Sequence, residues 1–420
     1  MVEIQLCIFV VGYLLISLEN YIKINKTATS LLIGVACWLC CTIELPQETI
    51  ESLLSEHLSS IAEVLFFLLS AMVIVELIDI HEGFGIIANQ IKASNFTALA
   101  IIICLLTFFG SAILDNLTTA IVMVSLLRKI VKEAKALILL SCLVIIASNA
   151  GGAWSPIGDV TTTMLWIEER ITAVGIIQSL IIPSLVSLAI PLFWIISNLK
   201  KLHFRLNNEP INSIKTTLVE RNAMLFIGMS IFILVPIFKY FTHFPPYMGM
   251  LFGLGIVWLL SEILHYRKDL EDREVFSAAN ALSRIDSSSI LFFLGILLAI
   301  SSLEATGVLK ALALALNQQT NSPTIVAIIF GLMSAVLDNV PLVAAAIGMY
   351  DLQNYPQDSD FWKLIAFCAG TGGSILIIGS AAGVAVMGMV KIEFGWYLRK
   401  ISLATLLGYF SGIFVYLLLN

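Results

Sequence analysis

The chain has 420 residues, of which 59% are hydrophobic and only 12% are charged. Soluble proteins carry about 25% charged residues, so this composition excludes an ordinary soluble domain and predicts an all-α polytopic membrane protein. The net charge of −6 offers no basic surface for nucleic acid. The cysteines at 37–41 have no histidine or second cysteine pair beside them. We therefore expect the lipid bilayer as surroundings, no nucleic-acid partner and no cofactor.

Apolar runs that can cross a bilayer as helices occur along the whole chain. The chain starts with such a run and has no basic leader or cleavage site, so we interpret it as a first span and not as a signal peptide. In the first half we predict spans near 4–19, 28–45, 61–80, 136–167 and 172–199, with a re-entrant hairpin at 97–130. In the second half we predict spans near 222–241, 247–265, 288–305, 361–391 and 396–418, with a second hairpin at 323–350.

The distribution of positive charge predicts how these segments are oriented, because Lys and Arg gather in cytoplasmic loops. Basic residues flank 97–130 and fill 201–221, which is expected to be a cytoplasmic linker. The first hairpin should therefore enter from the cytoplasm. The second has aspartates beside it and almost no base, so it should enter from outside. The predicted domains are two inverted repeats, residues 1–200 and 222–420.

Sequence matches between the halves support this duplication. SAILDNLTTA (111–120) matches SAVLDNVPLV (334–343), and GGAWSPIGD (151–159) matches GGSILIIGS (372–380) in the same order. Inverted repeats with interrupted helices are typical of secondary transporters. The sequence thus predicts a hairpin and a broken helix in each half.

The segment SNAGGAWSPIGDVTTTMLW (148–166) places glycines, a proline, hydroxyls and a carboxylate inside an apolar run. A packing break is one interpretation. We favour a site, because freed backbone groups must face protein or water and ionisable residues within spans are usually functional. Each hairpin has Leu-Asp-Asn at its tip, facing a break. The predicted first-repeat site consists of Asp115, Asn116, Thr118, Asn149, Ser155, Asp159, Thr161 and Thr162. The predicted second-repeat site consists of Asp338, Asn339, Thr371, Ser374 and Ser380.

These oxygen-rich side chains suit a hard cation, and we expect Na⁺ to bind between Asp115 and Asp159. Two carboxylates in a desolvated site cannot both stay charged at small cost, so the pair should hold either a cation or a proton. Competition for one site that opens alternately to each side of the membrane is exchange. Ser380 takes the register position of Asp159, which leaves the second site with one carboxylate fewer.

Polar and aromatic residues of interest also occur outside the breaks. Glu76 lies deep in the third span and is a candidate proton relay, and His81 at its cytoplasmic end is a candidate pH sensor. We favour a solvated surface histidine for His81. The aromatic residues near span ends are interpreted as interface anchors; they are Trp166, Tyr240, Tyr247 and Tyr397.

The motifs LDNLTTAIVM (114–123), LDNVPLVAAA (337–346) and the segment 148–166 resemble those of the NhaD-type sodium/proton antiporters of the ion-transporter superfamily. The resemblance extends from the third span to the last. It implies paired inverted repeats, two hairpins, two broken helices and a homodimer that moves its substrate by an elevator-like shift. It assigns the family's polar motif positions to Asp115, Asn116, Thr118, Asn149, Asp159, Thr161, Thr162, Asp338, Asn339 and Ser374.

The favoured function is exchange of Na⁺, and also Li⁺, for H⁺ across a bacterial inner (plasma) membrane. The alternative is a sodium-coupled carrier of a small anion such as a dicarboxylate, because helix N-termini at the breaks can bind carboxylates. Against it stands the expectation that no Lys or Arg lies in the site. An intramembrane enzyme is disfavoured because the sequence contains neither a metal-binding motif nor a nucleophile–base pair. A channel is disfavoured because the hairpins would occlude it.

Overall fold

The computed structural model describes residues 2–17, 22, 24–44, 46–90, 93, 95–202, 216–266, 268–320 and 322–420. Regular structure in these residues is helical, and nine of the described helices are long and apolar enough to cross a membrane. The predicted fold class is confirmed in that the chain is an all-α integral membrane protein, and each half contains a hairpin and a broken helix.

The helices of the first half are, in chain order, α1 (Val2–Ser17), α3 (Lys26–Glu44), α4 (Gln47–Ile80), α5 (Gly83–Gln90), the hairpin α6 (Phe96–Leu114) and α7 (Asn116–Ile130), the broken helix α8 (Ala134–Gly152) and α9 (Val160–Ile167), and α10 (Ala173–Leu199). Those of the second half are α11 (Leu218–Thr242), α12 (Pro246–His265), α13 (Leu270–Val275), α14 (Ala278–Arg284), α15 (Ser287–Ala305), α16 (Val308–Thr320), the hairpin α17 (Pro323–Ser334) and α18 (Asn339–Met349), the broken helix α19 (Asp360–Gly372) and α20 (Ala381–Val390), α21 (Phe394–Lys400), and α22 (Ser402–Leu419).

Polar residues at the breaks restart the helices that follow them. The Asp115 carboxylate accepts from the Thr118 N–H and caps α7. Asp159 caps α9 through the Thr161 N–H, and Ser380 caps α20 in the corresponding place. Asp and Ser side chains satisfy the unpaired N–H groups at a helix start. The same polar residues that interrupt a continuous helix therefore cap the helix that follows each break.

Two predicted boundaries differ from the structure. Helix α4 begins at Gln47 and not near residue 61, because hydropathy measures partition into lipid, whereas a polar stretch is also able to form helix. The last predicted span, 396–418, is divided into α21 and α22, and α20 and α21 are bent by 112°. Of the predicted linker 201–221, residues 203–215 lie outside the described residues, and its end belongs to α11.

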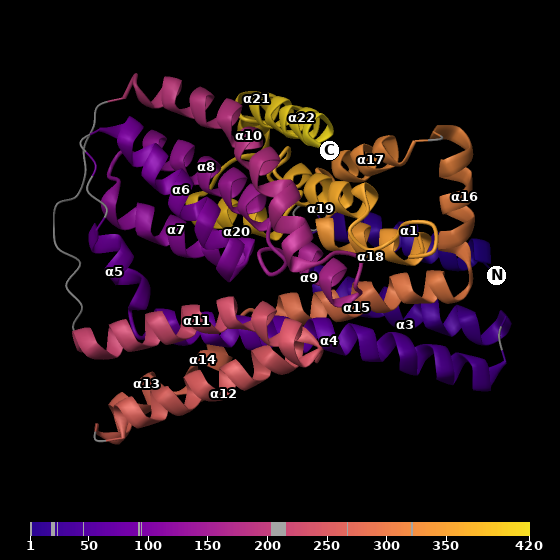
Figure 1. Cartoon of the computed structure of the whole chain (residues 1–420), viewed down its shortest axis with the longest axis horizontal. Coiled ribbons are helices and arrows are strands. Elements are labelled where there is room, and N and C mark those ends of the chain that lie inside the picture. The colour runs from indigo at the N-terminus through magenta and orange to yellow at the C-terminus, as the bar shows by residue number, and fades with distance from the viewer. Residues whose placement is uncertain are drawn as a thin grey trace.

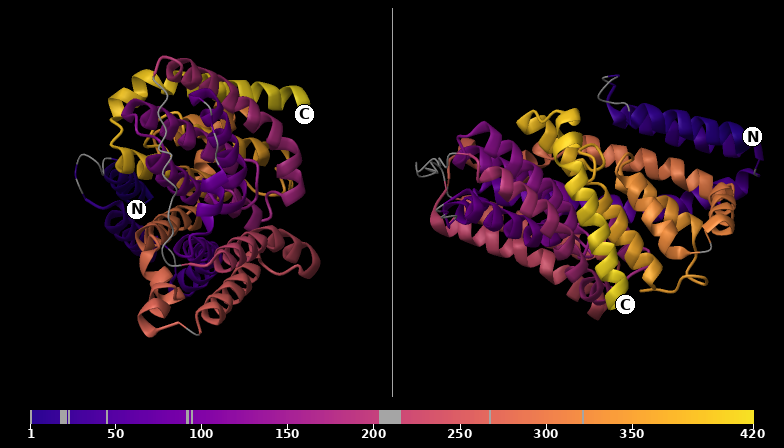
Figure 2. Two further views of the ribbon diagram at one scale, coloured as in Figure 1. Left: turned by 90° about the vertical axis from the view of Figure 1, so that its left-hand side faces the viewer. Right: turned by 90° about the horizontal axis from the view of Figure 1, so that it is seen from above.

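The helices form two groups that face each other (Figure 1). The long-helix layer comprises α3, α4, α11, α12 and α15, which contact one another along their lengths. The hairpin layer comprises both hairpins, both broken helices, α10 and α22. The left view of Figure 2 shows the same separation from a second side. The layers meet where α18 contacts α15, where α9 contacts α4 and where α6 contacts α11. The first two of these meeting points lie beside the breaks.

Helix α3 packs closely along α15. Gly34 faces Gly295, and the Trp38 Nε1–H donates to the Leu298 carbonyl at 2.9 Å. A Cβ atom at Gly34 would lie 2.6 Å from the Gly295 oxygen, which is inside van der Waals contact. Small residues permit such close helix approach in membrane proteins.

We predict that Gly34→Ala lowers the free energy of unfolding by about 1–3 kcal/mol, because the methyl group overpacks a backbone contact. Gly255→Ala is the matched control, because nothing lies within 4 Å of a Cβ atom at that position of α12. Thermal unfolding of the purified variants in detergent measures both. If Gly34→Ala and Gly255→Ala melted at the same temperature, α3 and α15 would be able to move apart enough to accept the methyl group without loss of stability.

Candidate functional site

The Asp159 carboxylate lies at the centre of the predicted site and is 1% exposed. Its Oδ2 accepts from Asn116 Nδ2 at 2.5 Å and from Asn339 Nδ2 at 3.1 Å. Its Oδ1 accepts from the Thr161 N–H and hydroxyl, each at 2.9 Å. A carboxylate offers about four acceptor positions, so donors from both hairpin tips and from α9 fill them.

Asn149 joins this cluster to the second broken helix. Its Oδ1 accepts from Asn116 Nδ2 at 3.0 Å. Its Nδ2 donates to the hydroxyls of Ser374 and Ser380, each at 2.8 Å. Asn149 is fully buried, so each of these bonds replaces one to water. Polar residues of both repeats thus form one hydrogen-bonded network around one aspartate.

Asp115 occupies the tip of the first hairpin in a strained backbone conformation. Its φ is +96°, a region that residues other than glycine rarely adopt and that costs about 1–3 kcal/mol. The Thr118 N–H and hydroxyl donate to its carboxylate at 2.8 and 2.7 Å. The tip therefore turns within a single residue and keeps a carboxylate where glycine would be less strained.

Two cavities adjoin the hairpin tips. One of about 40 Å³ is lined by Asp115, Asp159 and Asp338, among others. A second, of about 370 Å³, extends between α4, α6, α7 and α11. Leu114 lines both. The larger cavity, which we call the vestibule, therefore ends at the first hairpin tip.

Some predicted residues lie near this centre but bond elsewhere. The Ser155 hydroxyl donates to the Ala112 carbonyl at 2.5 Å, and the Thr162 hydroxyl donates to the Asp159 carbonyl at 3.0 Å. The Thr371 hydroxyl donates to Phe367 within its own helix. The Ser155 bond therefore joins the first break to α6, and the other two bonds are local. In the described part of the chain, no group of three or more His, Cys, Asp and Glu side chains is placed to hold a metal ion.

Two residues at the site were not anticipated. Lys26 lies between the predicted spans 4–19 and 28–45, but in the structure it begins α3, and its Nζ lies 3.6 Å from Asp338 Oδ2. The expectation that no Lys or Arg lies in the site is therefore wrong. Tyr397, interpreted above as an interface anchor, is fully buried and donates to the Ser374 carbonyl at 2.8 Å. Lys26 is distant from Asp338 in sequence, so no local motif marks the pair.

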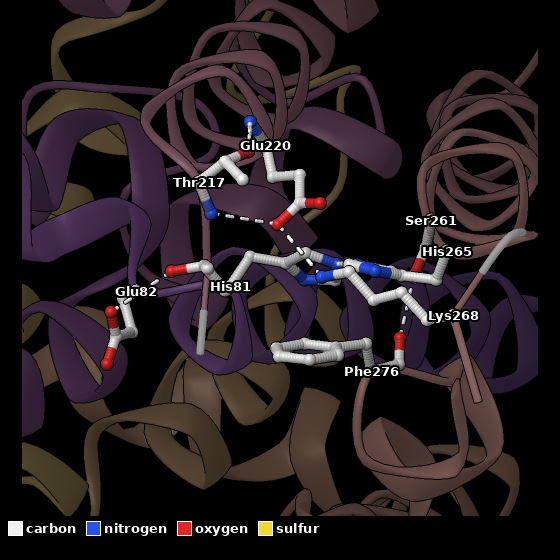
Figure 3. Close-up of polar contacts among 9 residues, drawn as sticks. His81, Glu82, Thr217, Glu220, Ser261, His265, Lys268 and Phe276 are labelled. Atoms are coloured by element: carbon white, nitrogen blue, oxygen red, sulfur yellow. Dashed lines mark hydrogen bonds and ion pairs between the residues drawn. The ribbon is translucent and has the colours of Figure 1, made fainter. Parts of the chain in front are cut away.

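The candidate relay Glu76 and the candidate pH sensor His81 make their polar contacts outside the Asp159 cluster. Glu76 forms an ion pair with Arg284 at 3.2 Å. His81 is fully buried, so the favoured interpretation of a solvated histidine is wrong. The His81 Nδ1–H donates to the Leu77 carbonyl at 2.6 Å, which leaves Nε2 to face His265 Nε2 at 2.8 Å (Figure 3).

Burial, the largest cause, lowers the pKa of His81 from 6.5 to about 4, with smaller contributions in the same direction from the neighbouring His265 and Lys268. The Leu77 carbonyl raises the pKa, as does Glu220, which itself pairs with Lys268 at 3.0 Å. Phe276 covers both imidazole rings. His81 is therefore neutral at neutral pH and joins the end of α4 to the end of α12.

Comparisons with known proteins match this chain to transporters. A family model described as "Citrate transporter" (CitMHS) matches residues 13–362. "Sodium/proton antiporter 2" of Arabidopsis thaliana is 46% identical over 98% of this chain and 98% of its own. "Na(+)/H(+) antiporter NhaD" of Vibrio cholerae is 31% identical over 99% of this chain and 91% of its own. The crystal structure of the Alcanivorax borkumensis YdaH transporter shares the fold, with a TM-score of 0.56 at 13% identity, covering 88% of this chain and 90% of that one.

We predict that Asn149→Ala lowers the free energy of unfolding by about 1–3 kcal/mol, because it leaves buried donors and acceptors without partners. The exposed residue Asn354 provides the control substitution Asn354→Ala. Thermal unfolding in detergent compares the two variants. If Asn149→Ala unfolds at the same temperature as the wild type, the network does not stabilise the contact between the two broken helices.

We predict that the folded state loses about 2 kcal/mol between about pH 7 and about pH 5 through His81. Below pH 6.5 the unfolded chain binds a proton at this residue, whereas folded His81 does so only near pH 4. Stability therefore falls as the pH falls through this window. The slope of melting temperature against pH should flatten in His81→Gln and not in His57→Gln. An unchanged slope in His81→Gln would assign the pH dependence to other groups.

Proposed function

Because the chain belongs to the NhaD-type sodium/proton antiporters, we propose that it exchanges Na⁺ for H⁺ by alternating access, with both ions competing at Asp159. The observation that carries this proposal is the Asp159 carboxylate, which accepts from Asn116 and Asn339 at the two hairpin tips. A charge that develops or disappears at this one group changes the contacts of both hairpins. The ions are cargo, and the proposal requires no cofactor.

The full set of donors around Asp159 favours competition. A cation needs carboxylate and amide oxygens, whereas Asn116 and Asn339 now present N–H groups. Binding of Na⁺ therefore requires an amide to rotate so that its oxygen faces the ion. Protonation of Asp159 likewise displaces one donor. Each ion thus excludes the other and weakens the same cross-hairpin contacts.

The geometry favours a cation over a small dicarboxylate. In the described residues, Asp115 and Asp159 form no ion pair with Lys, Arg or His, and Lys26 is paired to Asp338. The cavity between the tips has about 40 Å³, and a single water needs about 10–15 Å³ by such a measure. A bare or partly hydrated ion fits, and a dicarboxylate does not.

The vestibule supports alternating access. Its wall includes Asp79, Glu82, Arg221 and Arg284, and it reaches Leu114 beside the ion-sized cavity. An aqueous path of this kind on one side of the hairpin gives ions access from that side. Opening to the other side then requires the hairpin layer to move against the long-helix layer. Glu76 lies next to this path through its pair with Arg284, so a relay role for it belongs to this proposal.

Further parts of the proposal come from sequence and family. They are transport of Li⁺, the opposite orientation of residues 1–200 and 222–420, and a homodimer. Relatives named sodium/proton antiporters occur in Arabidopsis thaliana as well as in bacteria, so the inner membrane of a bacterium remains a prediction.

We predict that Asp159→Asn abolishes exchange, because the amide carries no charge for Na⁺ and takes up no proton. Proteoliposomes with an acidic lumen and an entrapped pH dye measure this. Wild-type protein should collapse the gradient on addition of NaCl or LiCl and not of KCl, and sodium citrate should add nothing beyond its sodium. Asp351→Asn is the control, because Asp351 is an exposed carboxylate that also accepts a backbone N–H.

Wild-type turnover by Asp159→Asn would remove Asp159 from the mechanism. If the wild type responds to neither Na⁺ nor Li⁺ but takes up labelled citrate driven by sodium, anion uptake would replace exchange as the proposed function.

A further inference from the structure

The Lys26–Asp338 ion pair lies largely out of contact with solvent. The two side chains are 21% and 12% exposed, and their charged atoms are 3.6 Å apart. The Lys26 ammonium also lies 4.3 Å from the ring centroid of Phe292 on α15, which is the geometry of a cation–π contact. This ammonium thus lies against both an aromatic face and a carboxylate.

Lys26 belongs to the long-helix layer. The next residue, Thr27, donates through its hydroxyl to the Ser288 carbonyl at 2.9 Å, which fixes the start of α3 on the start of α15. Asp338 precedes α18 and belongs to the hairpin layer. The ion pair therefore joins the two layers at the tip of the second hairpin.

Asp338 is adjacent in sequence to Asn339, the residue whose amide contacts Asp159 at 3.1 Å. One peptide bond separates the group held by Lys26 from the group that touches the proposed cargo carboxylate. Asp338 Oδ1 is buried and has no hydrogen-bond partner among the described residues. The ammonium at Oδ2 is thus the charged partner that the structure provides for this carboxylate.

We propose that Lys26 is the built-in counter-cation of the second repeat. It neutralises Asp338, so this carboxylate takes no cargo ion, and it positions Asn339 against Asp159. A tethered ammonium is present at high effective concentration and therefore excludes Na⁺ from Asp338 at ordinary salt. Lys26 is a positioning residue for the first-repeat site. Its effect on transport rests on the proposed exchange, and its effect on the second hairpin does not.

The test uses Lys26→Gln, Lys26→Arg, Asp338→Asn and the double variant Lys26→Gln/Asp338→Asn in the proteoliposome assay. Lys26→Gln should raise the Na⁺ concentration for half-maximal exchange at least about tenfold, because the unpaired carboxylate displaces the tip. Lys26→Arg should stay within about threefold of wild type, since a guanidinium also neutralises Asp338. The double variant should match Asp338→Asn within about threefold. Lys310→Gln, at an exposed position of α16, is the control.

Thermal unfolding of the same variants gives a readout without transport. Lys26→Gln should lower the melting temperature by about 5 °C or more. Adding Asp338→Asn should restore at least half of this loss. A double variant as impaired as Lys26→Gln in either assay, or an unimpaired Lys26→Gln, would overturn the counter-cation role. If Lys26→Gln does not fold, recovery of folding in the double variant supports the role and failure overturns it. A wild type without exchange refutes the proposed function alone, and the melting temperatures still decide the ion pair.

Discussion

The structure depends on the cost of placing one carboxylate, that of Asp159, away from water. A buried carboxylate is tolerated only where hydrogen-bond donors surround it. The donors come from Asn116 at one hairpin tip, from Asn339 at the other, and from Thr161 at the start of α9. Both hairpins must therefore reach the same break. Because the two repeats meet at this group, a proton or a cation bound there in the proposed exchange would change the contacts of both.

The repeats share an architecture and differ in charge. Asp159 and Ser380 cap corresponding helices. In both repeats, the side chain of the residue before the helix therefore satisfies a backbone N–H at the helix start. A serine caps without introducing charge, and the remaining carboxylate of the second repeat, Asp338, is paired with Lys26. The first repeat keeps two carboxylates without a basic partner in the described residues. In the proposed exchange, the duplicated scaffold thus carries a single ion-responsive centre.

The sequence predicts local features of this molecule well and long-range partners poorly. Breaks, hairpin tips and caps follow from glycine, proline and Leu-Asp-Asn within a few residues of each other, and the structure has them at Asp115 and at residues 153–159. The ion pair of Lys26 and the burial of His81 were missed, because both depend on helices distant in the chain. A histidine at the end of a span looks solvated until α12 brings His265 against it. Hydropathy also placed the start of α4 too late, since it reports lipid contact and not helix formation.

The small volume between the hairpin tips has a further consequence for ion choice. A space of about 40 Å³ holds about three water-sized particles, so an ion cannot enter with its complete hydration shell. The energy of stripping water from the ion then becomes part of selectivity, alongside the charge of Asp159. Mg²⁺ dehydrates reluctantly and would be rejected at this step despite its stronger attraction to carboxylates. In the proposed exchange, the site therefore selects its cargo by dehydration before any side chain coordinates it.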